Sequence, residues 1–113
     1  MSNNVKNMLD NKVIEFNARI NDEPDFAKLI EGKNRTICIC VSDGENYSSK
    51  LENLILDDFV VTENTSMDLV VNASSEILEA LITKVMSPIK AYMKGDLKVK
   101  ASFTDMLLLK RLF

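Results

Sequence analysis

Residues 87 to 113 have the sequence SPIKAYMKGDLKVKASFTDMLLLKRLF, and this C-terminal stretch decides the fold. Proline suits the first turn of a helix and glycine its end, so Ser87-Pro88 and Gly95 delimit a short predicted helix. From residue 97 to 103 apolar and polar residues alternate, which is typical of a strand with one buried face. Thr104 is the expected cap of a final helix whose apolar side chains cover nearly its full circumference. Such a helix needs the core, a partner or a ligand to cover it.

The segment before this stretch is predicted to form another helix. Ser74 or Ser75 is its expected N-cap, and Glu76 favours the positive end of the helix dipole. Behind these residues, apolar side chains recur at helical spacing and form one broad stripe, which consists of Ile77, Leu78, Leu81, Ile82, Val85 and Met86. The stripe indicates that one side of this helix is buried.

The middle of the chain has an apolar pattern with a period of two, which indicates strands. Residues 35–42 place apolar or small side chains on both faces, so we expect an inner strand there. A short turn connects it to a second strand at 47–53, which makes a hairpin. Further strands are predicted at about 55–63 and 67–72, and four strands in succession suggest an antiparallel meander.

The N-terminal segment is predicted to form two helices. The first has one apolar stripe, made by Val5, Met8, Leu9, Val13, Phe16 and Ile20. The second is expected from Pro24 to Glu31 and is ended by Gly32. Its inward-facing residues are expected to be Phe26, Leu29 and Ile30. The complete order of elements predicts an α+β fold, with a mostly antiparallel five-stranded sheet and helices packed over one face.

Composition limits the possible functions. The chain has 113 residues, of which 46% are hydrophobic and 27% charged, so residues 1–113 are expected to form a single globular domain. The net charge of −3 offers no overall basic field for nucleic acid or anionic lipid. The sequence has no signal-like apolar run at its start and no membrane-span pattern, so we expect a cytoplasmic protein.

The two cysteines, Cys38 and Cys40, lie two residues apart on a predicted strand. Their side chains point to the same face with nearly parallel Cα–Cβ vectors, which is poor geometry for a disulfide. The chain has no histidine to complete a zinc site with them. We therefore predict reduced, buried cysteines, no metal and no cofactor.

Several segments resemble the sterol carrier protein 2 family. They are the run 67–71 (MDLVV), the helix 74–84, the break 86–88 (MSP), the segment 91–100 (AYMKGDLKVK) and the apolar end 107–113. The family pattern is an apolar strand, a helix, a Met-x-Pro break, an aromatic-rich turn closed by glycine, a strand and a closing apolar helix. Three places depart from it: Lys84-Val85 replaces a usual Gly-Lys pair, Ala101 stands where glycine often follows the last strand, and Arg111-Leu112-Phe113 replaces the peroxisomal Ser-Lys-Leu-type end of some relatives.

The resemblance implies a lipid-sized apolar tunnel between the sheet and the helices. The expected function is non-catalytic binding or transfer of an apolar lipid, such as a fatty acid, acyl-CoA, isoprenoid or sterol-like molecule. The candidate tunnel residues are Leu69, Val71, Ile77, Leu78, Leu81, Ile82, Val85, Met86, Ile89, Tyr92, Met93, Leu97, Val99, Phe103, Met106, Leu107, Leu109, Leu112 and Phe113. For each of them, plain core packing is the competing interpretation.

A rival hypothesis is an interaction module. In it, the C-terminal apolar helix contacts a second copy of the chain or a lipid-metabolising enzyme, because an exposed apolar patch normally marks an interface. Membrane contact is expected to be transient at most, and nucleic acid is not an expected partner. Catalysis ranks last, because the chain has no histidine and no visibly activated nucleophile.

Overall fold

The computed structural model describes residues 2–112, so the candidate tunnel residue Phe113 lies outside the described part of the chain. The order of helices and strands agrees with the sequence prediction, except that one predicted strand is two short strands. It is α1 (Ser2–Asp22), α2 (Pro24–Ile30), β1 (Arg35–Val41), β2 (Asn46–Glu52), β3 (Ile55–Leu56), β4 (Val60–Val61), β5 (Leu69–Ala73), α3 (Ser75–Ile82), α4 (Pro88–Lys94), β6 (Lys98–Lys100) and α5 (Phe103–Leu112).

The sheet is mixed and has six strands, which corrects the predicted mostly antiparallel five-stranded sheet and its meander of four consecutive strands. Its order is β3-β2-β1-β5-β6, and β4 also pairs with β2. β1 and β2 form the expected antiparallel hairpin, but β5 runs parallel to β1, with Ile39 opposite Val71. β6 is antiparallel to β5, with Val99 opposite Val71. After β4 the chain therefore crosses to the free edge of β1, where β5 pairs in parallel, instead of continuing the sheet on the β2 side.

The predicted strand at 55–63 is two short strands, because part of its backbone bonds to a side chain of α1 instead of to a neighbouring strand. The Asn17 side chain of α1 donates to the Leu56 carbonyl and accepts from the Leu56 amide, both at 2.9 Å. Between the two strands, Phe59 is fully buried in the core. α1 thus fixes this edge of the sheet, and periodicity alone gives no sign of that contact.

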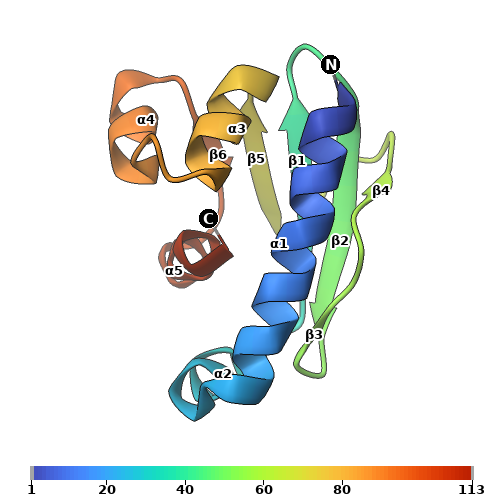
Figure 1. Ribbon diagram of the computed structural model, residues 1–113, viewed down its shortest axis with the longest axis vertical. Coiled ribbons are helices and arrows are strands. Elements are labelled where there is room, and N and C mark those ends of the chain that lie inside the picture. The colour runs from blue at the N-terminus through green and yellow to red at the C-terminus, as the bar shows by residue number, and fades with distance from the viewer. Residues whose placement is uncertain (1, 113) are drawn as a thin grey trace.

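All the helices bury their apolar sides in one core on one face of the sheet (Figure 1). The predicted α1 stripe is confirmed, with Met8 partly buried and the other members buried. On the opposite face a small cluster contains Cys38, Cys40 and Val70. Both cysteines are free and buried, as predicted. The pKa of the Cys38 thiol is raised to about 12. Burial is the main cause, and the hydrogen bond with Cys40 is the second.

The connection between α3 and α4 differs from the prediction. Ser74 is the N-cap, since its hydroxyl accepts from the Ile77 amide at 3.2 Å, but the helix ends at Ile82. Lys84 then has a φ of 64°, in the left-handed region. This turn directs Val85 away from the core, so the prediction that it belongs to the buried stripe is wrong.

Two other apolar side chains and one helix cap differ from the sequence prediction. Leu29 is exposed, whereas Phe26 and Ile30 of the same helix are buried as expected. Phe103 is 79% exposed, because the chain has already begun α5 and no longer alternates as a strand. The cap of α5 is Ser102 rather than Thr104, since the Ser102 hydroxyl accepts from the Asp105 amide at 3.2 Å.

Candidate functional site

An apolar groove of about 320 Å³ lies between α4, β6 and α5. Its lining residues are Val71, Pro88, Ile89, Tyr92, Leu97, Val99, Phe103, Met106, Leu107, Leu109 and Lys110. Lys110 is the one charged residue among them. The rim is open, because Ile89, Tyr92 and Phe103 are all exposed. The volume falls in the range of about 300 to 1,000 Å³ that is typical of small-molecule sites.

Local sequence signals position the first two walls of this groove. Ser87 and Pro88 begin α4, and Gly95, with a φ of 84°, ends it and turns the chain toward β6. The turn is closed by the amides of Asp96 and Leu97, which both donate to the Ala91 carbonyl, at 3.0 and 3.2 Å. Val99 of β6 then pairs with Val71 of β5, and together they line the groove.

The third wall, α5, is anchored at both ends. In its first turn, Asp105 accepts two hydrogen bonds from Nε of Arg35 in β1, at 2.9 and 3.1 Å. The Asp105 side chain is only 7% exposed, whereas the Arg35 side chain is 32% exposed, so the carboxylate is the shielded member of this ion pair. At the other end, Arg19 of α1 donates to the Arg111 carbonyl at 3.2 Å. The sequence offered no signal for either contact, since the partners are 70 and 92 residues apart.

The structure brings one subset of the predicted tunnel residues together around the groove. They are Val71, Ile89, Tyr92, Leu97, Val99, Phe103, Met106, Leu107 and Leu109. Their contact with a ligand stays a prediction. The groove also contains Pro88 and Lys110, which the sequence analysis did not select.

The other predicted tunnel residues lie elsewhere. Leu69, Leu78 and Ile82 are buried in the core, and Ile77 packs against it. Leu81, Val85 and Met86 line a separate cavity of about 640 Å³ beside α4 that also contains Lys84, Lys90, Lys94 and Lys110. Met93 is 79% exposed and lines none of these cavities.

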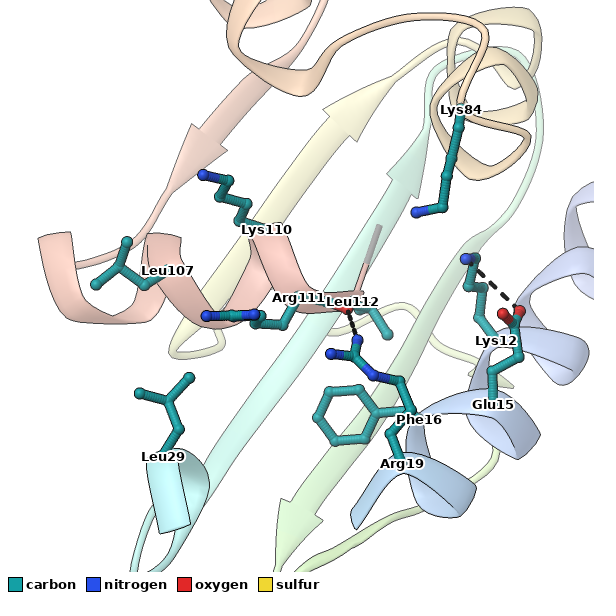
Figure 2. A pocket seen from close by; sticks show the side chains of 10 residues that line it. All are labelled: Lys12, Glu15, Phe16, Arg19, Leu29, Lys84, Leu107, Lys110, Arg111 and Leu112. Atoms are coloured by element: carbon teal, nitrogen blue, oxygen red, sulfur yellow. Dashed lines mark hydrogen bonds and ion pairs between the residues drawn. The ribbon is translucent and has the colours of Figure 1, made fainter. Parts of the chain in front are cut away.

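A second site, which sequence reasoning missed, adjoins the groove along α5, and Figure 2 shows the side chains that line it. We call it the basic cleft. It has a volume of about 500 Å³, and its lining residues are Lys12, Glu15, Phe16, Arg19, Leu29, Lys84, Leu107, Lys110, Arg111 and Leu112. One signal was present in the sequence: Lys110 and Arg111 are the only charges in the apolar end of the chain, from residue 106 onward.

Neither a metal centre nor a membrane span is found in the part of the chain that the structure describes. Across residues 2–112, no group of three or more His, Cys, Asp or Glu side chains could hold a metal ion. None of the helices formed by these residues has both the length and the apolar character needed to cross a bilayer.

The sheet order and the placement of all helices on one face define an α+β fold of the sterol carrier protein 2 type. A sterol carrier protein 2 from Aedes aegypti, in complex with the C16 fatty acid palmitate, has a TM-score of 0.67 at 13% identity, over 95% of this chain and 92% of that chain. A crystal structure of sterol carrier protein 2 gives 0.62 at 13% identity, over 93% and 92% of the two chains. The sequence itself matches no family model and no curated protein.

The same fold occurs inside a larger enzyme. The inverting sec-alkylsulfatase Pisa1 from a Pseudomonas species has a TM-score of 0.62 at 17% identity, over 76% of this chain. The present chain spans only 14% of that protein's length. At such identities the similarity establishes the fold alone.

Proposed function

We propose that this protein binds the hydrocarbon chain of a lipid in the apolar groove and acts as a non-catalytic lipid carrier. One observation carries the proposal: the groove is bounded by apolar side chains from β5, α4, β6 and α5, with Lys110 as its one charged residue. Burial of hydrocarbon against such walls is favourable by about 25 cal/mol per Å². A fatty acyl chain is the ligand class that best fits an apolar lining with a single charged side chain.

Two further observations support a hydrocarbon ligand. Met106 lies in the groove wall, and methionine adapts to ligands of different shape. Two neighbours of the same fold, both from Aedes aegypti, are palmitate-bound or palmitated. The predicted closed tunnel would require the exposed rim residues Ile89 and Phe103 to close over the bound chain.

The rival interaction module receives less support from the packing of α5. Leu108, Leu109 and Leu112 are buried against the rest of this chain, so they are not available for a partner. Phe103 and Leu107 are the apolar side chains that the described part of this helix leaves exposed. A second copy or a lipid-metabolising enzyme would therefore have only a small apolar surface to contact on α5.

The test combines mass spectrometry with thermal unfolding. Native mass spectra before and after organic extraction should reveal a co-purified lipid that extraction removes. Palmitate added to the extracted protein should then raise the melting temperature, because a ligand at 100 times its Kd adds about 2.7 kcal/mol to the unfolding free energy. A melting curve that palmitate leaves unchanged would contradict the proposal.

Paired variants localise the binding. Val99→Trp should fill the groove and abolish the palmitate-induced shift, since Val99 lies in its wall. Val60→Trp is the matched control, because Val60 is an exposed strand valine outside the groove. It should leave the shift intact. Equal shifts in both variants would mean that palmitate binds elsewhere.

A further inference from the structure

The basic cleft concentrates positive charge in a chain whose net charge is −3. Its cations come from three parts of the fold: α1, the α3–α4 connection and α5. They are Lys12, Arg19, Lys84, Lys110 and Arg111, and Glu15 is the single carboxylate among the lining residues. Concave sites lined by one sign of charge attract ligands of the opposite sign.

Lys12 is the most unusual of these residues, because its side chain is only 9% exposed. Its nearest carboxylate oxygen, Oε2 of Glu15, is 3.6 Å away and therefore too far for a hydrogen bond. Figure 2 shows Lys12 reaching from α1 and Lys84 reaching from the α3–α4 connection into the space between them. An anion in the cavity would give the Lys12 ammonium a closer partner than Glu15.

Lys84 occupies a backbone position that favours glycine. The Val85 amide donates to the Ala80 carbonyl at 2.9 Å, and the Lys84 amide donates to the Leu81 carbonyl at 3.2 Å. These bonds form a Schellman motif with Lys84 at the left-handed position, where its φ is 64°. A side chain kept here in spite of backbone strain points to a use for its charge.

The other cations differ in how strongly they are already engaged. The Arg19 guanidinium binds Glu23 at 3.1 Å and lies 4.2 Å from the centre of the Phe26 ring, so it forms a fixed wall. Lys110 and Arg111, on the last turn of α5, enter no ion pair with any other described residue within 4.0 Å. The cleft therefore combines a fixed wall with cations that can still engage a ligand.

We propose that the basic cleft binds a phosphate group. A doubly charged phosphate matches the excess of cations better than a single carboxylate does, and lysine is a common point-charge partner of phosphate. The groove and the cleft share Leu107 and Lys110. An alkyl chain attached to the phosphate would therefore cross Leu107 into the groove. Only this last step, which makes the ligand a phosphorylated amphiphile, rests on the proposed function above.

Three probes separate the two sites: inorganic phosphate, dodecyl phosphate and dodecanol, each titrated by calorimetry at low ionic strength. We expect dodecyl phosphate to bind at least about tenfold more tightly than dodecanol, because charge-assisted hydrogen bonds add to the burial of the chain. Lys84→Gln should reduce this preference about fivefold or more, and Lys84→Arg should retain most of it. Lys98→Gln removes the same charge from β6, outside the cleft, and should have no effect.

The outcomes distinguish the phosphate site from the lipid groove. Equal affinities for dodecyl phosphate and dodecanol, or equal losses in Lys84→Gln and Lys98→Gln, would overturn the phosphate site and leave the groove intact. Binding of inorganic phosphate that depends on Lys84, without any binding of dodecanol, would support the phosphate site and overturn the lipid proposal. Val99→Trp should weaken both alkyl probes and leave the affinity for inorganic phosphate unchanged.

Discussion

The groove and the basic cleft adjoin each other along α5, yet their chemistry is opposite. The groove has one cation, and the cleft has five. Within ten residues, α5 directs Met106 and Leu109 to the groove and Arg111 and Leu112 to the cleft. Successive helical residues are turned by 100°, so one short sequence can form two unlike walls. The nearly complete apolar circumference of this helix hides that division in the sequence.

The charged residues are unevenly distributed along the chain. Residues 84–112 contain seven Lys or Arg and two Asp, whereas the whole chain has 14 basic and 17 acidic residues. The C-terminal part is therefore basic within an acidic protein. Net charge alone predicts no basic field, but a ligand responds to the local potential of the surface that it meets.

The largest expected effect is on the unfolding free energy, which should fall much more for a core residue than for a residue of the cavity wall. Leu78→Ala removes a fully buried α3 side chain and should lower the unfolding free energy by about 3 to 5 kcal/mol. Leu107→Ala removes a side chain that is 46% exposed on the boundary between groove and cleft, and should cost less than about 1 kcal/mol. Urea unfolding measures both. At a urea concentration where both variants are folded, only Leu107→Ala should weaken palmitate binding. Weaker binding by Leu78→Ala, with normal binding by Leu107→Ala, would mean that Leu78 lines the ligand site.

Breaking the anchor of α5 should disturb both cavities at once. Arg35→Ala leaves the buried Asp105 carboxylate without its partner, which should cost about 2 to 3 kcal/mol. Arg35→Lys keeps the charge but not the double hydrogen bond, so it should recover only part of this loss. Palmitate and phosphate should both bind more weakly to Arg35→Ala. Weaker binding of only one ligand would mean that the groove side and the cleft side of α5 respond independently to the loss of Arg35.

The sequence predicted the local elements well, because their signals lie within a few residues of one another. The Ser87-Pro88 start and the Gly95 end of α4 were correct, as were the Ser74 cap and the buried stripe of α1. Sheet topology was not accessible in this way. The parallel pairing of β1 with β5 joins residues 32 apart, such as Ile39 and Val71, and no local pattern encodes it.

The candidate site was predictable only on its apolar side. The tunnel candidates implied by the resemblance include nine lining residues of the groove. Their apolar character did not distinguish them from core residues such as Leu69 and Leu78, since both types lie at helical or strand spacing. The basic cleft was not predicted, because Lys12 and Lys110 meet only after folding. A helix of mostly polar surface, such as α1, gives no sign of which lysine faces a cavity.

A smaller effect, of opposite sign, is expected at the strained corner of the cleft. Lys84→Gly should raise the unfolding free energy by about 1 kcal/mol, because glycine accepts the left-handed conformation without a Cβ penalty. The same variant should bind dodecyl phosphate more weakly, and dodecanol affinity should not change. Thermal unfolding and calorimetry on one preparation test both. A less stable Lys84→Gly variant would show that the Lys84 side chain stabilises the corner itself.

The smallest effect should arise at a contact that touches neither cavity. Asp43 accepts hydrogen bonds from the Ser75 hydroxyl at 2.6 Å and from the Ser75 amide at 2.7 Å, which lowers the pKa of Asp43 below its usual 3.8. Because the folded pKa is lower than the unfolded one, the ionised carboxylate stabilises the fold above pH 3.8, and this contribution is lost as the pH falls through the folded pKa. Asp43→Asn should therefore be less stable than the parent at pH 7, with the difference narrowing at acidic pH. Both ligands should bind this variant normally, so a change in either affinity would show that the α3 N-terminus is coupled to the walls of α5.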